Sequence, residues 1–81
     1  MRPPPEHCVC EDCTSADLKV ELSRQVAKHG DLPSDDLKCS AILSEECGEV
    51  ARAVLESSPR ESLRAELLQV ACFALRWRNA L

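Results

Sequence analysis

Hydrophobic residues recur along most of this chain at intervals of three and four, the spacing of a helix with one buried face. The first such stripe consists of Leu18, Leu22 and Val26. It predicts a helix over residues 15–29, with Thr14 or Ser15 placed to cap it and Gly30 placed to end it.

A second helix is predicted after a linker that contains both Gly30 and Pro33, two strong breakers of regular structure. Ser34 can cap this helix, and Asp35 and Asp36 would then lie in its first turn, where carboxylates favour the positive end of the helix dipole. The helix is expected to run to about Ser57. Its hydrophobic stripe consists of Leu43, Cys47, Val50 and Val54.

A third helix begins at a predicted capping box, Ser58-Pro59-Arg60-Glu61, with proline at the first helical position. One stripe of this helix consists of Leu63, Leu67, Val70, Ala74, Trp77 and Leu81, and a second stripe consists of Leu68, Cys72 and Leu75. The short connection predicts that helices two and three form an antiparallel hairpin. The second stripe then needs another partner, either helix one or a second subunit.

These patterns predict an all-α protein in which a helical hairpin and an N-terminal helix form one domain over residues 15–81, preceded by a Pro/Cys-rich segment over residues 1–14. Only 2% of the 81 residues are aromatic, which disfavours an all-β fold. A domain this small buries too little surface to be very stable alone. We therefore expect a four-helix-bundle-type core that is completed by dimerisation.

Charge and hydropathy exclude several classes of function. The formal net charge is −4, which disfavours binding to the phosphates of nucleic acid. No apolar run approaches the roughly 20 residues that cross a bilayer. The first residues lack the apolar stretch of a secretory signal, so we expect a cytoplasmic protein.

Acidic residues crowd one face of helix two and face polar residues of helix three. Five side chains are expected to meet at one level of the hairpin: Glu45, Glu46, Glu49, Glu66 and Gln69. Oxygen ligands that converge from two helices suit Mg²⁺ or Mn²⁺, and a cation would relieve the repulsion between the carboxylates. The alternative is that these acids form an ordinary solvated helix face, since Glu is a common exposed helix former.

The same residues resemble the MazG-like all-α nucleoside triphosphate pyrophosphohydrolases, whose motifs are E-E-x-x-E on one helix and E-x-x-D on the next. The chain has Glu45-Glu46-Cys47-Gly48-Glu49 and then Glu66-Leu67-Leu68-Gln69, and the resemblance covers roughly residues 18–81. The upstream runs Arg24–Gly30 and Ala41–Ser44 also look like the family's sequence before the acids. Gln69 departs from the pattern, because its amide can coordinate a metal but carries no charge.

The resemblance implies Mg²⁺-dependent hydrolysis of a nucleoside triphosphate to the monophosphate and pyrophosphate. Glu45, Glu46 and Glu49 would be catalytic and would bind the metal together with Glu66 and Gln69, while Lys28 and His29 would contact the nucleotide. Family members form dimers or dimers of dimers. The alternative is a non-catalytic helical interaction or regulatory protein of the same fold, in which the neutral Gln69 has weakened metal binding.

The N-terminal segment contains four side chains that are candidate zinc ligands: His7, Cys8, Cys10 and Cys13. The C-x-x-C spacing occurs in zinc loops, so a structural Zn²⁺ site is one interpretation. A disordered or redox-sensitive tail is the other. A small zinc-dependent DNA-binding regulator is a third hypothesis for the whole protein, although the acidic balance argues against it.

Overall fold

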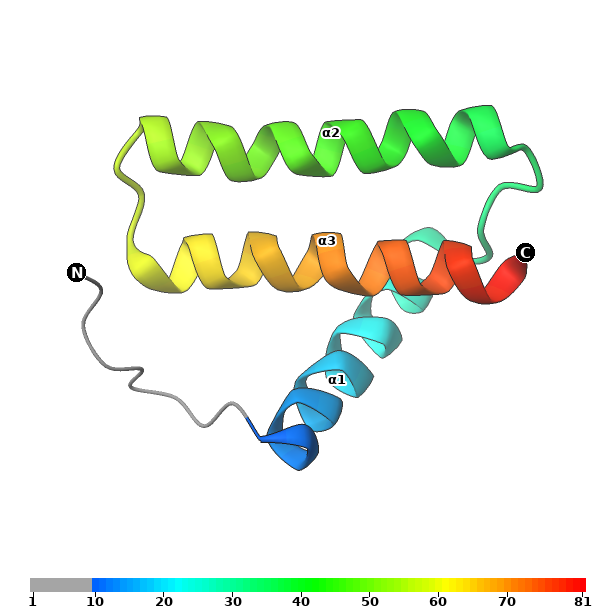
Figure 1. The fold of residues 1–81 in the computed structure, drawn as a ribbon, viewed down its shortest axis with the longest axis horizontal. Coiled ribbons are helices and arrows are strands. Elements are labelled where there is room, and N and C mark those ends of the chain that lie inside the picture. Colours follow the sequence, from blue (N-terminus) through cyan, green and yellow to red (C-terminus); the bar gives the residue numbers. More distant parts are fainter. Residues whose placement is uncertain (1–9) are drawn as a thin grey trace.

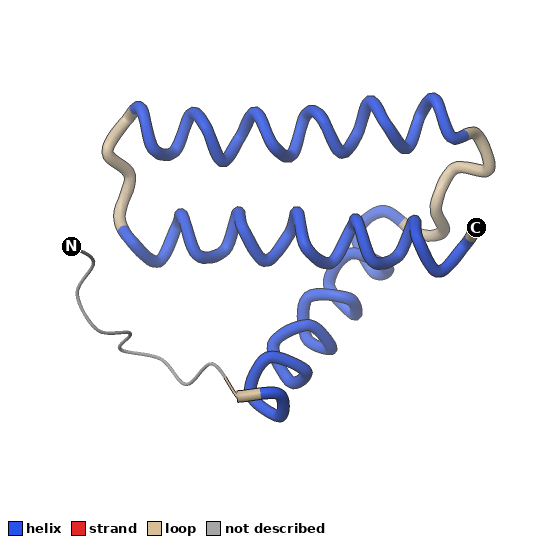
Figure 2. The backbone as a smooth tube through the Cα atoms, in the orientation of Figure 1, coloured by secondary structure: helices blue, strands red, loops and turns tan. Residues whose placement is uncertain are grey.

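The computed structural model describes residues 10–81, and every regular element in that range is an α-helix (Figure 1). The helices are α1 (Glu11–His29), α2 (Asp36–Leu55) and α3 (Arg60–Ala80). α2 and α3 form an antiparallel hairpin, and α1 crosses α3 obliquely (Figure 2). Within the described residues α1 packs against α3 and not against α2. The all-α prediction of a hairpin plus an N-terminal helix is confirmed.

The predicted start of α1 was wrong by one turn. The helix begins at Glu11, and its N-cap is Cys10, whose Sγ accepts a hydrogen bond from the backbone N–H of Cys13 at 3.4 Å. Glu11 and Asp12 occupy the first turn, where their charges favour the helix dipole. Two acids in the first turn therefore support a longer helix than the hydrophobic pattern alone predicts.

The starts of α2 and α3 each lie close to the predicted position but shifted in register. Asp35, not Ser34, caps α2, because its Oδ1 accepts a hydrogen bond from the N–H of Leu37 at 2.8 Å. Proline was predicted as the first residue of α3, but Pro59 is the cap residue and the helix begins at Arg60. The side-chain cap of α2 is thus displaced by one residue, whereas the side-chain capping predicted for the start of α3 is not confirmed, because the cap residue Pro59 forms no such bond.

The hairpin turn depends on one residue in the left-handed region. Ser57 has φ 52°, and the N–H of the next residue, Ser58, donates to the carbonyl of Ala53 at 2.9 Å. A left-handed residue with this backbone bond is how many helices satisfy their last carbonyls. The chain can therefore reverse within a few residues and return along α2.

The fully buried apolar core is small. Among residues 10–81, three apolar residues are buried: Cys39, Cys72 and Phe73. At the open end of the hairpin the Nε1 of Trp77 donates to the Oδ1 of Asp36 at 3.0 Å, which joins the last turns of α3 to the start of α2. None of the three helices is long and apolar enough to cross a membrane.

The face that α1 turns toward α3 is polar, which corrects the predicted apolar face. Leu22 and Val26 of the predicted stripe are exposed, whereas Glu21 and Gln25 are only 6% and 4% exposed. Leu18 is half-buried. Hydrogen bonds between Gln25 and α3 determine which side of α1 is buried. The spacing of hydrophobic residues in the sequence does not predict such bonds.

Helix α1 covers the second stripe of α3, one of the two partners left open by the sequence. Cys72 is buried, and Leu68 and Leu75 are half-buried. Burial, followed by the nearby negative charge of Glu21 on α1, raises the pKa of the Cys72 thiol. One chain therefore shields Cys72 fully and Leu68 and Leu75 in part.

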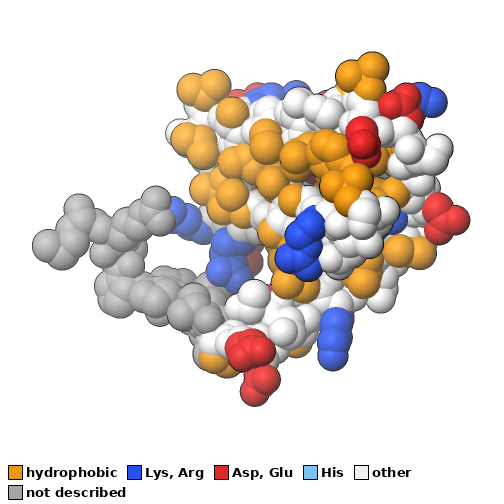
Figure 3. Space-filling model, turned by 45° about the vertical axis from the view of Figure 1, so that its right-hand side comes forward, with side chains coloured by type: hydrophobic (Ala, Val, Ile, Leu, Met, Phe, Trp, Pro, Cys, Tyr) orange, Lys and Arg blue, Asp and Glu red, His pale blue; other side chains and the backbone are white. Residues whose placement is uncertain are grey.

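The main hydrophobic stripes of α2 and α3 remain partly exposed to water. We call this surface the hairpin face; it comprises Leu43, Cys47, Val50, Val54, Leu63, Leu67 and Val70. Val54 is 59% exposed and Leu67 is 51% exposed. Figure 3 shows hydrophobic side chains gathered in a band across the hairpin. The isolated chain thus leaves much of its predicted core in contact with water.

Candidate functional site

A cavity of about 700 Å³ lies between the hairpin and the C-terminal half of α1. One part of its wall is acidic and is formed by α2 and α3, and another part is basic and includes Arg24, Lys28 and Arg76. Apolar side chains complete the wall: Leu32, Pro33, Ile42 and Phe73. A cavity with an acidic part, a basic part and an apolar wall suits a ligand that carries a cation, an anion and a flat apolar group.

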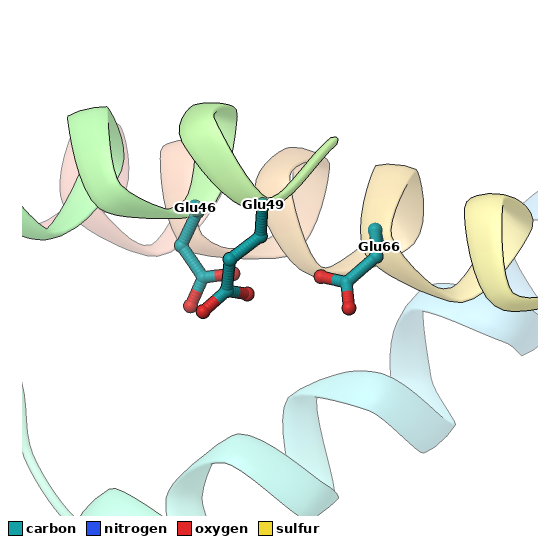
Figure 4. A group of neighbouring side chains, drawn as sticks. All are labelled: Glu46, Glu49 and Glu66. Atoms are coloured by element: carbon teal, nitrogen blue, oxygen red, sulfur yellow. The ribbon is translucent and has the colours of Figure 1, made fainter. Parts of the chain in front are cut away.

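Three carboxylates converge in the acidic part of the cavity. Glu46, Glu49 and Glu66 each offer an oxygen, and these oxygens lie within 4.8 Å of one another (Figure 4). Glu46 and Glu49 are one turn apart on α2, and Glu66 approaches from α3. The hairpin register that was expected to bring position 49 beside position 66 is confirmed.

Two oxygens of this cluster lack hydrogen-bond partners. Glu46 Oε2 and Glu66 Oε2 are buried and accept no hydrogen bond from any of the described residues. An unsatisfied buried polar group costs about 1–3 kcal/mol, and more when it is charged. Two buried carboxylate oxygens are therefore left without a partner, and a divalent cation that prefers oxygen ligands would satisfy them.

Burial and mutual repulsion perturb the titration of the cluster. Desolvation, followed by the charges of Glu49 and Glu66, raises the pKa of Glu46. Desolvation, followed by the adjacent Glu49 carboxylate, raises the pKa of Glu66. Both groups therefore hold protons more tightly than an ordinary glutamate does, and a bound cation would favour their ionised forms.

The other two predicted ligands lie on the same cavity wall but outside the group of three. Glu45 is exposed and Gln69 is half-buried. The main-chain carbonyl of Gln69 accepts a hydrogen bond from Gln25 Nε2 at 3.2 Å. All five predicted side chains thus share one cavity, and three of them converge closely enough to hold one ion.

Lys28 and His29, predicted as nucleotide contacts, also line the cavity. They end α1, where basic residues favour the negative end of the helix dipole. Their position across the cavity from the acids is compatible with contacts to a ligand, and this role stays a prediction.

Sequence reasoning missed a hydrogen-bonded network that joins α1 to α3. Arg24 donates from Nε and Nη2 to the two oxygens of Glu21 at 2.8 and 2.7 Å. Gln25 donates to Glu21 at 2.8 Å, and its Oε1 accepts from Arg76 Nη1 at 3.3 Å. Nη2 of Arg76 donates to the Gly30 carbonyl at 2.9 Å. The hydrogen bond from Arg24 is the main cause of the lowered pKa of Glu21.

This network left a weak sequence signal, because Glu21, Arg24 and Gln25 are three and four residues apart and so share one helix face. Such a spacing is also typical of exposed salt bridges. Only the position of α3 shows that this polar face is buried.

The predicted zinc site cannot be followed through all of its ligands. His7 and Cys8 lie outside the described residues. Cys10 and Cys13 are exposed and lie on the first turn of α1. The zinc site therefore stays a prediction.

Any binding of Mg²⁺ by these carboxylates is expected to weaken as the pH falls. Carboxylates must be deprotonated to bind a metal ion. Because the pKa values of Glu46 and Glu66 are raised, protons compete with the metal for these carboxylates at a higher pH than they would for ordinary glutamates. Affinity should fall about tenfold per pH unit for each protonated carboxylate. Thermal unfolding with and without Mg²⁺, from about pH 8 to about pH 5, measures this effect. A Mg²⁺-induced rise in Tm that stays constant over this range contradicts the prediction.

The metal-free protein should respond to pH in the opposite direction. A raised pKa means that ionisation of Glu46 and Glu66 opposes folding, so this cost disappears as the pH falls through their folded-state pKa values. The lowered pKa of Glu21 contributes stability that is lost only at still lower pH. As the pH is lowered, we therefore expect the Tm of the metal-free protein first to rise and then to fall.

Comparison of the chain with models of protein families, with curated proteins and with solved structures found no match.

Proposed function

We propose that this protein is a Mg²⁺-dependent nucleotide pyrophosphohydrolase that cleaves a nucleoside triphosphate to the monophosphate and pyrophosphate. The observation that supports this most directly is the convergence of Glu46, Glu49 and Glu66, with two buried oxygens that lack partners. Such a cluster is costly for a protein that binds no cation. The MazG-like motif pattern supplies the substrate class.

The chemistry requires a nucleophilic water and neutralised phosphates. Bound Mg²⁺ would supply charge neutralisation of the polyphosphate and would lower the pKa of a coordinated water. The three converging glutamates, with Glu45 and Gln69 beside them, would hold the ion. A glutamate oxygen that is free of the ion would accept the proton of the water as it attacks the α-phosphorus. The bond between that phosphorus and the bridging oxygen then breaks, and pyrophosphate leaves.

The rest of the cavity suits the remaining parts of a nucleotide. Ile42 and Phe73 offer an apolar wall for the base, and Leu32 and Pro33 extend it from the loop between α1 and α2. Lys28 and His29 are the proposed nucleotide contacts on the other side. The cavity volume of about 700 Å³ falls within the range of small-ligand sites.

We further propose that two chains associate through the hairpin face to form a four-helix core. Val54 and Leu67 are more than half exposed there, while few residues of the isolated chain are fully buried. Covering this surface would supply the hydrophobic burial that a small domain lacks. None of the hairpin-face residues lines the cavity, so the cavity would stay accessible. Two such dimers could associate further.

Release of pyrophosphate from a panel of ribo- and deoxyribonucleoside triphosphates tests the proposed activity. We expect turnover that depends on Mg²⁺ or Mn²⁺ and that stops when a chelator removes the ion. Nucleoside monophosphate should appear in equal amount, whereas release of inorganic phosphate and a diphosphate would contradict the proposed cleavage. Because the substrate base is unspecified, the panel should include modified triphosphates.

A non-catalytic protein of the same fold is the second candidate, and the neutral Gln69 on the cavity wall favours it. A loss of one negative charge weakens attraction for a divalent cation. Absence of turnover together with absence of any Mg²⁺-dependent rise in Tm would support this candidate. Turnover of any triphosphate would exclude it.

A further inference from the structure

Arg24 presents a guanidinium group that is fixed along one edge and open along the other. Its Nε and Nη2 donate side by side to the two oxygens of Glu21, at 2.8 and 2.7 Å. Among residues 10–81 no hydrogen bond is formed by Nη1. The side chain is partly exposed and lines the cavity. The open edge is therefore available to a ligand.

The carboxylate that holds Arg24 is buried and is itself held in place. Glu21 is 6% exposed and also accepts a hydrogen bond from Gln25 at 2.8 Å. Gln25 in turn donates to the main chain of α3 at Gln69. The guanidinium thus has a defined position relative to the helix that carries Glu66.

Arg24 also lies beside the acidic cluster. Its positive charge lowers the pKa of both Glu46 and Glu66, although burial of these groups has the larger and opposite effect. Once a divalent cation has neutralised those carboxylates, the guanidinium no longer serves them as a counter-charge. An anion bound to the same cation would then be the nearest group that can accept hydrogen bonds from the Arg24 guanidinium.

We propose that Arg24 binds the polyphosphate of the substrate through its open edge, and that Glu21 is a positioning residue that aims it there. This proposal rests on the proposed function, because it assigns a further contact within the same site. A planar guanidinium can donate two parallel hydrogen bonds to phosphate oxygens. Because Glu21 already holds the other edge, Arg24 loses less side-chain entropy when it binds a phosphate. Arg24 would stabilise the transition state by donating hydrogen bonds to the phosphate oxygens as negative charge builds on them.

The test compares Arg24→Gln and Glu21→Gln with the wild-type protein in Mg²⁺-dependent pyrophosphate release. We expect Arg24→Gln to lower kcat/KM by about a hundredfold, the size of effect seen when one transition-state hydrogen-bond donor is removed. Glu21→Gln should lower it less and mainly by raising KM, because Arg24 is then present but not fixed. Arg24→Lys keeps the charge without the planar group and should rescue only part of the loss.

Arg64→Gln is the matched control. Arg64 is also paired with a glutamate three residues earlier, Glu61, at 3.8 Å, but it lies on the part of α3 outside the main cavity. It should leave kcat/KM unchanged. The Mg²⁺-dependent rise in Tm should persist in every one of these variants, because none of them removes a proposed metal ligand.

The outcomes separate this proposal from the one on which it rests. A folded Arg24→Gln protein with wild-type kcat/KM overturns the role of Arg24 and leaves the pyrophosphohydrolase intact. Loss of the Mg²⁺ response in Arg24→Gln also overturns it, since the arginine would then support the acids and not the substrate. A wild-type protein without turnover refutes both. If Arg24→Gln does not fold, Arg24→Lys with full activity and KM overturns the proposal.

Discussion

Glu46→Gln should raise the Tm of the metal-free protein and abolish its Mg²⁺-dependent turnover. Glu46 is half-buried, has one unpartnered oxygen and repels two other carboxylates. Removing its charge should stabilise the metal-free fold by about 1 kcal/mol, which corresponds to a rise in Tm of roughly 4–8 °C for a domain of this size. The same substitution removes a metal ligand, so turnover should fall at least about a thousandfold.

Differential scanning calorimetry with and without Mg²⁺, together with pyrophosphate release, measures both effects. Glu56→Gln is the matched control, because Glu56 is an exposed acid at the end of the same helix and does not line the cavity. It should keep both the Mg²⁺ response and the turnover. Full Mg²⁺-dependent turnover in Glu46→Gln would reject the proposed site. A Glu46→Gln variant that is more stable but inactive is the result expected for a functional site whose carboxylates repel one another.

Leu67→Glu should separate the proposed dimer and destabilise the chain. The hairpin face would be buried between two copies, so each dimer would contain two new carboxylates without partners. We expect the dissociation constant to rise by more than a hundredfold, about 3 kcal/mol. Wild-type Tm should increase with protein concentration, and this dependence should disappear in the variant.

Sedimentation equilibrium over a range of concentrations measures the change in assembly. Val20→Glu makes the same chemical change at a residue that is 73% exposed on α1 and outside the hairpin face. This control should remain as associated as the wild-type protein. A wild-type chain that is monomeric at every concentration would refute dimerisation through the hairpin face.

The acidic site could be predicted because it depends on short-range helical geometry. Glu46 and Glu49 lie one turn apart on any helix, and a short turn fixes which residue of α3 faces them. The expectation that Glu66 would meet them therefore needed only the helix period and the position of the turn. The exposed Glu45 shows the limit of this reasoning, since a helix face is broader than an ion site.

The packing of α1 could not be predicted in the same way. Its apolar residues Leu22 and Val26 indicated one inner face, but the structure buries Glu21 and Gln25. The choice depends on hydrogen bonds to residues more than forty positions away in the chain. Hydrophobic periodicity contains no information about such partners.

By itself, the sequence determined the three helices, their hairpin connection and the acids that share a level of the hairpin, because each of these follows from local backbone geometry. Only the tertiary structure decided which face of α1 is buried, that Arg24 reaches the cavity beside the acids, and that the main apolar stripes stay open. These features depend on where separate helices lie relative to one another. That arrangement is set by the balance of hydrogen bonding and burial over the whole chain, and no single stretch of residues contains it.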